Sequence, residues 1–314
     1  ALTLDGVDVT GDVVSGDYTI PAGTDGQSLV YSETASNGIA PDATQSMSET
    51  VSGAPEATGG TVTDITDGGQ DYRVHEFTSS GDLVVTVGGE FEVLIVGPGG
   101  PGGSSWGYTA TGGGSGGSVL TSTLTLSPGT YPVIPGTAVT PTLNGPWLAT
   151  NTTAFGLTAV RGGRGGGWRD INTFRDPTDG GGGHARIAAD AGYVGVAHPT
   201  SGTGGDAFAD GANRSAGGGR GAGGDGQDAT ATQAGDGGPG VTSGITGTSI
   251  EYGRGGGGGS REQTAGAPNG SGGNSNGSAG ANPGDGGGGA SEASQNYRLG
   301  GIGADGIVIV RYQR

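Results

Sequence analysis

The chain lacks several residue types on which common functional sites depend. It has 314 residues and no cysteine, which excludes disulfides, a thiol nucleophile and a thiolate metal site. All 13 basic residues are arginine, so the lysine-rich patches typical of nucleic-acid binding are missing. No apolar run is long enough to cross a bilayer. We therefore expect no nucleic-acid partner and no membrane insertion.

The sequence also offers little for catalysis or cofactor binding. The three histidines are not spaced like metal ligands; they are His75, His184 and His198. A letter match to a nucleophile motif at 113–117 lacks the strand, helix, histidine and acid that this chemistry needs. An acidic loop beside Trp168 would suit a sugar-binding surface or a glycosidase pair. We predict no enzyme activity, no metal and no cofactor, with a glycan depolymerase as the third functional alternative.

Most charged residues are acidic, and the excess of acids is largest in the N-terminal part of the chain. The formal net charge is −17, and residues 1–76 hold thirteen acids and one base. Such an excess keeps an extended segment soluble. The first residue, Ala1, fits removal of an initiator methionine, and the charged-then-apolar pattern of a signal peptide is missing. We expect synthesis in a host cytoplasm.

Short strand patterns occupy residues 1–31, where Asp5-Gly6 is a two-residue hairpin signal. They carry too few apolar residues for an independent core, which predicts a small β anchor that attaches to another protein or to another copy. Residues 32–70 are rich in Ser, Thr, Gly and acids. This composition predicts a flexible linker.

Apolar strand patterns begin after residue 70. Residues 71–160 contain several, and Val93–Val96 lose their alternation, as a strand buried on both faces would. One further β-branched strand, Gly306–Tyr312, lies at the far end of the chain. It needs a sheet to join, so we predict one β-sandwich-like domain made of residues 71–160 and 304–314.

Glycine dominates the segment between these two parts. The chain has 78 glycines, without the strict three-residue repeat of collagen. Glycine has no side chain to bury, so order must come from backbone pairing between extended helices of the polyproline-II type. We predict that residues 161–303 form a polyglycine-II bundle with exposed loops. The fold class is therefore mainly β with irregular structure and essentially no α-helix.

A known pattern runs through residues 72–314. A strand at Glu92–Val96 precedes a glycine run, a strand at Ser118–Leu126 and the turn Ser127–Thr130, and the chain closes on Gly303–Tyr312. This order resembles the glycine-rich domain of bacteriophage tail fibres and tail-tip adhesins. The resemblance implies packed polyglycine-II helices whose variable loops, at one end, contact a receptor on a bacterial surface.

The inserts between glycine runs carry aromatic and long polar side chains, which make good anchors at low entropic cost when held on rigid loops. The alternative is that they cap the bundle and shield its terminal hydrogen bonds. The candidate receptor-binding residues are Trp168, Arg169, Phe174, Arg175, His184, Tyr193, His198, Phe208, Tyr252 and Tyr297.

Composition and resemblance together lead to a functional expectation. We expect a virion protein, either a tail fibre or a tail-tip adhesin, that binds a host glycan or outer-membrane protein. The second alternative is a purely structural protrusion, such as a head fibre or a capsid decoration protein. Residues 1–31 are expected to hold other virion proteins. The chain is expected to form a homo-oligomer, with a trimer as one option.

Overall fold

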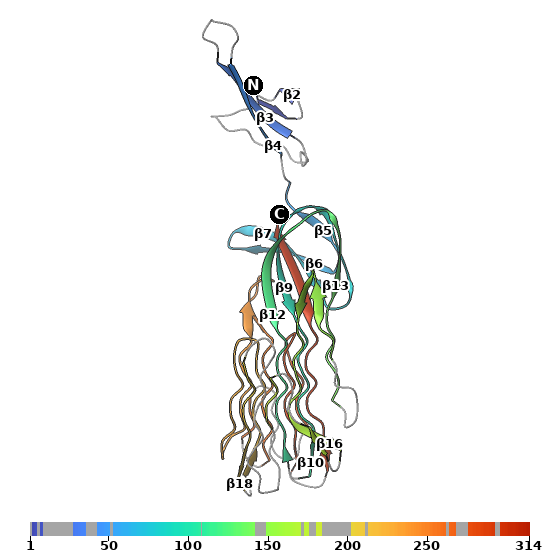
Figure 1. The fold of residues 1–314 in the computed structure, drawn as a ribbon, viewed down its shortest axis with the longest axis vertical. Coiled ribbons are helices and arrows are strands. Elements are labelled where there is room, and N and C mark those ends of the chain that lie inside the picture. Colours follow the sequence, from blue (N-terminus) through green and yellow to red (C-terminus); the bar gives the residue numbers. More distant parts are fainter. Residues whose placement is uncertain are drawn as a thin grey trace.

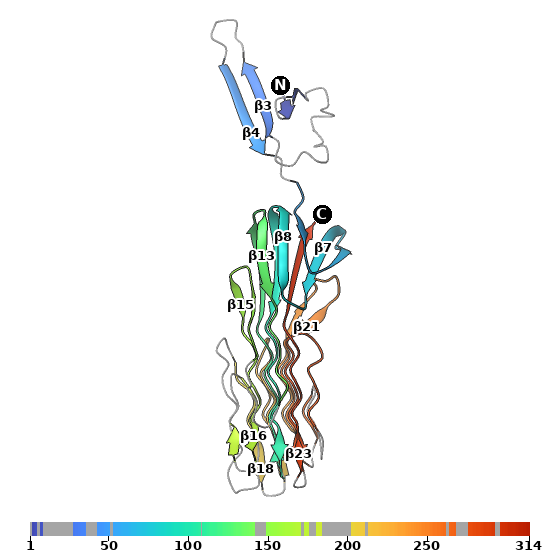
Figure 2. The same ribbon diagram turned by 90° about the vertical axis from the view of Figure 1, so that its right-hand side faces the viewer.

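The protein is mainly β, and no α-helix occurs in its described residues (Figures 1 and 2). The predicted fold class is therefore confirmed. The computed structural model describes residues 2–4, 7–8, 28–35, 43–50, 53–107, 109–141, 149–170, 173–175, 180–183, 202–210, 213–261, 264–267, 276–292 and 296–314. None of the described segments is a helix of the length and apolarity needed to span a bilayer.

The first 50 residues contribute a small antiparallel sheet in the order β2-β1-β3-β4. Its strands are β1 (Leu2–Leu4), β2 (Val7–Asp8), β3 (Ser28–Ala35) and β4 (Ala43–Thr50). Strands β1 and β2 pair as a hairpin around residues 5–6, as the Asp-Gly signal predicts. The predicted flexible linker is wrong, because strands β3 to β6 extend into residues 32–70.

A five-stranded antiparallel sheet forms the first layer of the sandwich, in the order β12-β9-β24-β7-β6. Its strands are β6 (Thr61–Asp67), β7 (Gln70–Phe77), β9 (Gly89–Val96), β12 (Val119–Leu126) and β24 (Ile307–Gln313). The C-terminal strand β24 lies between β9 and β7. This confirms the prediction that it joins the sheet formed by the residues before the glycine region.

A second five-stranded sheet forms the other layer, in the order β15-β14-β13-β8-β5. Its strands are β5 (Glu56–Thr58), β8 (Gly81–Val87), β13 (Gly129–Ile134), β14 (Thr152–Ala154) and β15 (Leu157–Ala159). The two layers bury a shared apolar core in which Phe91, Leu83 and Val133 are fully enclosed. Tyr312 reaches across this core, and its hydroxyl accepts a hydrogen bond from the Ala57 N–H at 3.0 Å.

The outer face of the first sheet is also covered in part. A hairpin from the glycine region, β20 (Val241–Ser243) and β21 (Ile250–Tyr252), packs there. Its Ile245 and Tyr252 join a second apolar cluster with Leu94. This explains why Val93–Val96 are apolar without alternation: successive side chains enter two different cores, and all four are buried.

The glycine segments run side by side as extended helices, from the sandwich to the opposite end of the molecule (Figures 1 and 2). Their backbone groups pair laterally: the Gly114 N–H donates to Gly287 at 2.8 Å, and the Gly256 N–H donates to Gly114 at 2.9 Å. A Cβ added at Gly113 would lie 1.8 Å from the Gly256 oxygen. No side chain fits at such a position, which is why these segments are glycine.

The bundle is larger than the predicted 161–303. Residues 97–117, predicted to belong to the β domain, also run as glycine helices: the Gly100 N–H donates to Ser115 at 2.8 Å, and the Gly162 N–H donates to Pro98 at 2.7 Å. The reason is geometric. Strands β9, β12 and β24 all meet glycine segments at this end, so residues 97–117, which connect β9 to β12, belong to the lattice.

One ion pair fixes the bundle near the sandwich. The carboxylate of Asp285 is fully buried and accepts bonds from the Arg254 guanidinium at 2.7 Å, the Arg254 N–H at 2.9 Å and the Asn282 N–H at 3.0 Å. Charge-assisted hydrogen bonds of this kind are about twice as strong as neutral ones. They hold the start of one glycine helix, at Arg254, beside the start of another.

Candidate binding surface

Short hairpins gather at the end of the bundle farthest from the sandwich, which we call the distal end (Figures 1 and 2). They comprise β10 (Ser105–Trp106), β11 (Thr109–Ala110), β16 (Gly167–Asp170), β17 (Thr173–Arg175), β18 (Phe208–Asp210), β19 (Asn213–Ser215), β22 (Ser291–Glu292) and β23 (Tyr297–Arg298). Strand β10 contacts β16, and β11 contacts β19. The hairpins therefore form one continuous surface.

Two of these hairpins pair with each other at the centre of the surface. Strand β10 pairs with β23, which sets Trp106 opposite Tyr297, and β11 pairs with β22. Both aromatic residues are half-buried, so each presents part of its ring to solvent. The Tyr297 hydroxyl is enclosed, and this burial raises its pKa.

An ion pair lies next to Tyr297 on the same strand. Glu292 is fully enclosed, and its Oε2 lies 2.8 Å from the Nε of Arg298, one residue after Tyr297. A buried carboxylate without a cation is strongly destabilising, so Arg298 has a fixed position. The contact ties β23, the strand that carries Tyr297, to β22.

The third hairpin, β18–β19, presents Phe208, which is half-buried and lies opposite Ser215 in the strand register. Its partner strand carries Arg214, only 5% exposed, and Ser215 forms a bridge to Ser260 of a neighbouring helix. This hairpin is therefore anchored on its inner side, and Phe208 lies on a fixed backbone.

The fourth hairpin carries four candidates. In β16–β17, Trp168 lies opposite Phe174, with an irregularity before Asp170. Arg169 and Arg175 lie on the same two strands. The backbone of these residues belongs to the distal surface, whereas their side chains lie outside the described set.

The remaining candidates have different outcomes. Tyr252 is wrong as an exposed anchor: it is 2% exposed and packs against the sandwich, at the other end of the bundle. His184, Tyr193 and His198 lie outside the described residues. Sequence reasoning missed Trp106, although it stands in a short insert between two glycine runs, as the selected aromatic residues do.

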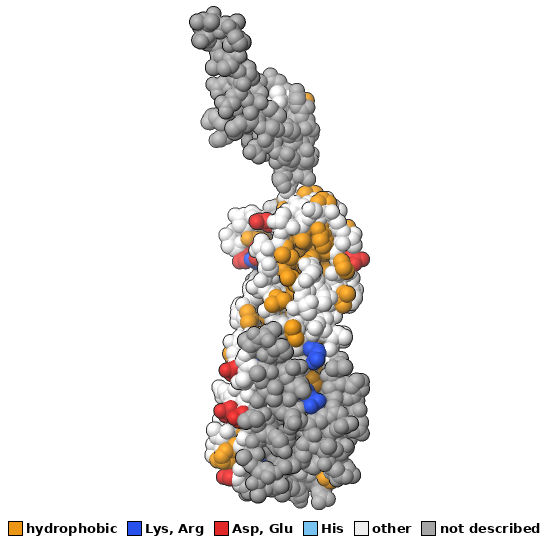
Figure 3. Space-filling view, viewed as in Figure 1, with side chains coloured by type: hydrophobic (Ala, Val, Ile, Leu, Met, Phe, Trp, Pro, Cys, Tyr) orange, Lys and Arg blue, Asp and Glu red, His pale blue; other side chains and the backbone are white. Residues whose placement is uncertain are grey.

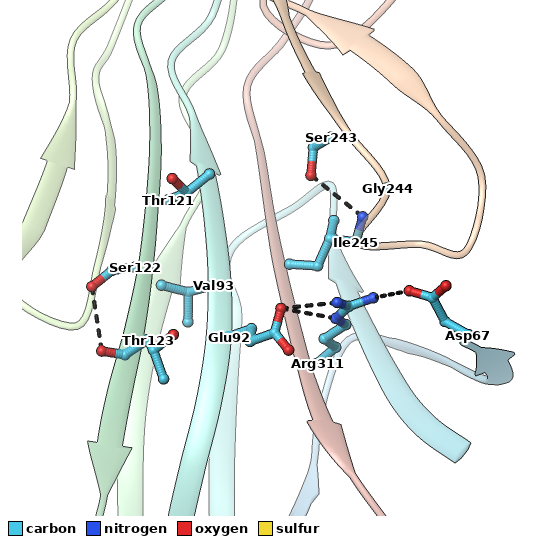
Figure 4. Close-up of a pocket in the computed structure, with 10 residues that line it drawn as sticks. All are labelled: Asp67, Glu92, Val93, Thr121, Ser122, Thr123, Ser243, Gly244, Ile245 and Arg311. Carbon is cyan, nitrogen blue, oxygen red and sulfur yellow. Dashed lines mark hydrogen bonds and ion pairs between the residues drawn. The ribbon is translucent and has the colours of Figure 1, made fainter. Parts of the chain in front are cut away.

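A separate cavity lies on the sandwich, between the outer face of the first sheet and the turn of the β20–β21 hairpin (Figure 4). Arg311 crosses it and bonds Glu92 at 3.1 Å and Asp67 at 3.0 Å. Its guanidinium also lies 4.5 Å from the centre of the Tyr72 ring. Both carboxylates in this cavity are thus engaged by one cation. Within the described residues, no group of three His, Asp or Glu side chains could hold a metal ion.

Comparison with known proteins gives one match. A family model described as a glycine-rich domain matches residues 77–313. It spans strands of both sandwich sheets and the whole glycine bundle, and it leaves out residues 1–76 and the last residue. No curated protein matches the chain.

Proposed function

Since the chain belongs to the glycine-rich domain family, we propose that it is a bacteriophage virion protein whose distal end binds a receptor on the host surface. It acts as a tail fibre or tail-tip adhesin, not as an enzyme. Residues 1–31 attach it to other virion proteins. The receptor is a cell-surface glycan or an outer-membrane protein.

One observation carries this proposal: aromatic side chains are mounted on short, rigid hairpins at a single end of the bundle. Trp106, Tyr297 and Phe208 are each half-buried there. Aromatic residues in such settings supply most of the energy at binding surfaces, because they offer a large area at a small entropic cost. The bundle beneath them is held by backbone hydrogen bonds, so little ordering is left for the binding step.

The hairpins also differ in length and sequence, whereas the helices beneath them cannot vary. A side chain added to most helix positions would strike a neighbouring carbonyl within about 2 Å. Variation is therefore confined to the hairpins. A scaffold with an invariant core and variable hairpins suits a protein that binds a receptor whose structure changes between hosts.

The test is binding of the purified full-length chain, fluorescently labelled, to a panel of bacterial cells. The double variant Trp106→Ala/Tyr297→Ala is expected to lower affinity by at least about 30-fold, the equivalent of one strong hot spot. The matched control is Thr66→Ala, an exposed residue on β6 at the other end of the molecule.

Equal binding by both variants would contradict the adhesin proposal. If the parent chain binds no cell type and antibodies against it label only the capsid of intact virions, the structural alternative replaces it. Release of sugar from cell envelopes by the parent chain would favour the depolymerase instead.

A further inference from the structure

The outer edge of strand β12 has no partner strand among the described residues. In the first sheet, β12 pairs with β9 along all eight of its residues, and no other described strand pairs with its outer edge. An edge of this kind presents a row of free backbone N–H and C=O groups to any strand that approaches it.

The four edges of the two sheets are not equally protected. At the opposite edge, β6 carries Asp64 and Asp67, which form ion pairs with Arg73 and Arg311. In the second sheet, the edge strands β5 and β15 have three residues each. Charges and shortness are the usual means of blocking strand addition. Strand β12, with the sequence VLTSTLTL, has eight residues, no charge and no proline.

An apolar groove runs beside this edge. It lies between the end of β12 and the hairpins of the second sheet, and Leu124, Tyr131, Phe155 and Leu157 line it. Ile134, at its rim, is 48% exposed. Figure 3 shows hydrophobic side chains gathered on this face of the sandwich, over β12 and β13. Contiguous exposed apolar surface of this kind marks an interaction site.

The backbone holds one of these groove residues in an unfavourable conformation. Phe155 has φ of +54° and is the only non-glycine among the described residues with a positive φ. A side chain at such a φ costs about 1–2 kcal/mol, and turns of this type favour Asn or Gly. Phe155 instead stands over the groove, with its ring 5.9 Å from that of Tyr131. The strained backbone places this ring, which also packs against the core, on the wall of the groove.

We propose that the outer edge of β12 pairs with β12 of a second copy of this chain, so that the two sheets join into one across a two-fold axis at Ser122. The strand is self-complementary about that point. In the antiparallel arrangement Leu120 of each copy lies opposite Leu124 of the other, on the groove side of the sheet. Thr121 lies opposite Thr123 on the outer side.

Charge favours a second copy at this site. The chain carries a net charge of −17, so two copies repel each other over most of their surface. The β12 edge and the groove beside it contain no charged residue. They form the surface on which two acidic chains can approach without bringing carboxylates into direct contact.

The first test is the mass of the full-length chain in solution, measured by sedimentation over a range of concentrations. The parent chain is expected to form a dimer. Thr123→Lys, which places a charge on the exposed side of β12, is expected to raise the dissociation constant at least 10-fold. The control Thr63→Lys makes the same change on the exposed edge strand β6 and is expected to leave the mass unchanged.

The second test uses the absence of cysteine from the natural sequence. In Ser122→Cys, the two thiols meet at the two-fold axis, so mild oxidation is expected to give a disulfide-linked dimer. Thr63→Cys is expected to stay monomeric on the same gel. A monomeric parent chain, an assembly whose mass Thr123→Lys does not change, or a failure of Ser122→Cys to cross-link would each overturn the proposal.

Discussion

The sandwich and the glycine bundle belong to one chain, but different interactions stabilise them. The sandwich buries large apolar side chains such as Phe91, Leu94 and Ile95, and burial of each such side chain contributes about 1.5–3 kcal/mol. The bundle has almost no side chains to bury. Its helices are held by lateral N–H to C=O bonds between segments far apart in sequence, each with a net value of about 1 kcal/mol.

The two regions respond in opposite ways to a change in size. A core of side chains is damaged when atoms are removed, because a cavity remains. A lattice of backbone is damaged when atoms are added, because the helices cannot separate without losing several hydrogen bonds at once. The contrast predicts that adding a single methyl group is most destructive in the bundle, whereas removing a large side chain is most destructive in the sandwich.

The largest effect is expected from adding one methyl group inside the bundle. In Gly113→Ala the new Cβ would lie 1.8 Å from the Gly256 oxygen and 2.9 Å from the Gly219 nitrogen. Both are backbone atoms, so no rotamer change relieves the collision. We expect destabilisation above about 4 kcal/mol, in the range that marks an exceptional lesion, measured by chemical denaturation.

The control for this substitution is Gly244→Ala. Gly244 lies in the turn of the β20–β21 hairpin, has nothing within 4 Å of its added Cβ and needs no positive φ. Its change is expected to stay within about 0.5 kcal/mol, as for an ordinary surface substitution. If Gly113→Ala is as stable as Gly244→Ala, lateral backbone packing does not hold the bundle.

A smaller effect is expected from removing a large side chain from the sandwich. Phe91 is fully buried between the sheets and makes an edge-to-face contact with Tyr312 at 5.1 Å. Phe91→Ala should cost about 3–4 kcal/mol, which is typical of an aromatic core truncation. The milder Phe91→Leu keeps most of the volume and should cost clearly less. Equal losses for both variants would show that cavity formation does not govern this core.

Much of the fold could be predicted because its strands carry a strong local signal. The unbroken apolar run at Val93–Val96 indicated a strand buried on two faces, and all four residues are buried. The β-branched strand Gly306–Tyr312 was expected to join the same sheet, and β24 pairs there with β9 and β7. The polyglycine-II bundle could be predicted because glycine has no side chain with which to form an apolar core. The linker prediction failed because β6 is an edge strand: Thr61–Asp67 is polar in composition, and its order comes from pairing with β7 and from the Arg73–Asp64 contact.

The candidate site was harder to predict, because inserts between glycine runs lie at both ends of the bundle. Among the described residues, the hairpin β18–β19 lies at the distal end, whereas β20–β21 packs on the sandwich. Composition was the available signal. The insert that holds Tyr252 also holds Val241, Ile245 and Ile250, an apolar set suited to a sheet face. Trp106 was missed because the glycine run around it was assigned to the sandwich.

The smallest expected effect is a pH dependence that belongs to the sandwich. His75 on β7 is fully buried and stacks on Tyr312 at 5.6 Å. Its Nδ1 lies 2.7 Å from the Gly59 oxygen, which fixes the tautomer that donates there. Its Nε2 has no partner among the described residues. Burial lowers the pKa of this imidazole, with a further lowering from the charge of Arg73 and an opposing effect of the Gly59 hydrogen bond and of Asp64.

A lowered pKa in the folded state means that the unfolded chain binds the proton first. The contribution of neutral His75 to stability is therefore fully present above the unfolded pKa of about 6.5, and it is lost as pH falls from there toward the folded pKa. We expect the melting temperature of the parent chain to drop more steeply between pH 7.5 and pH 5.5 than that of His75→Gln, whose amide does not titrate. His184, His198 and all carboxylates are common to both chains, so their titration cancels in the difference. Parallel pH profiles would mean that His75 reaches solvent when it is protonated, and that this part of the sandwich opens more easily than its packing indicates.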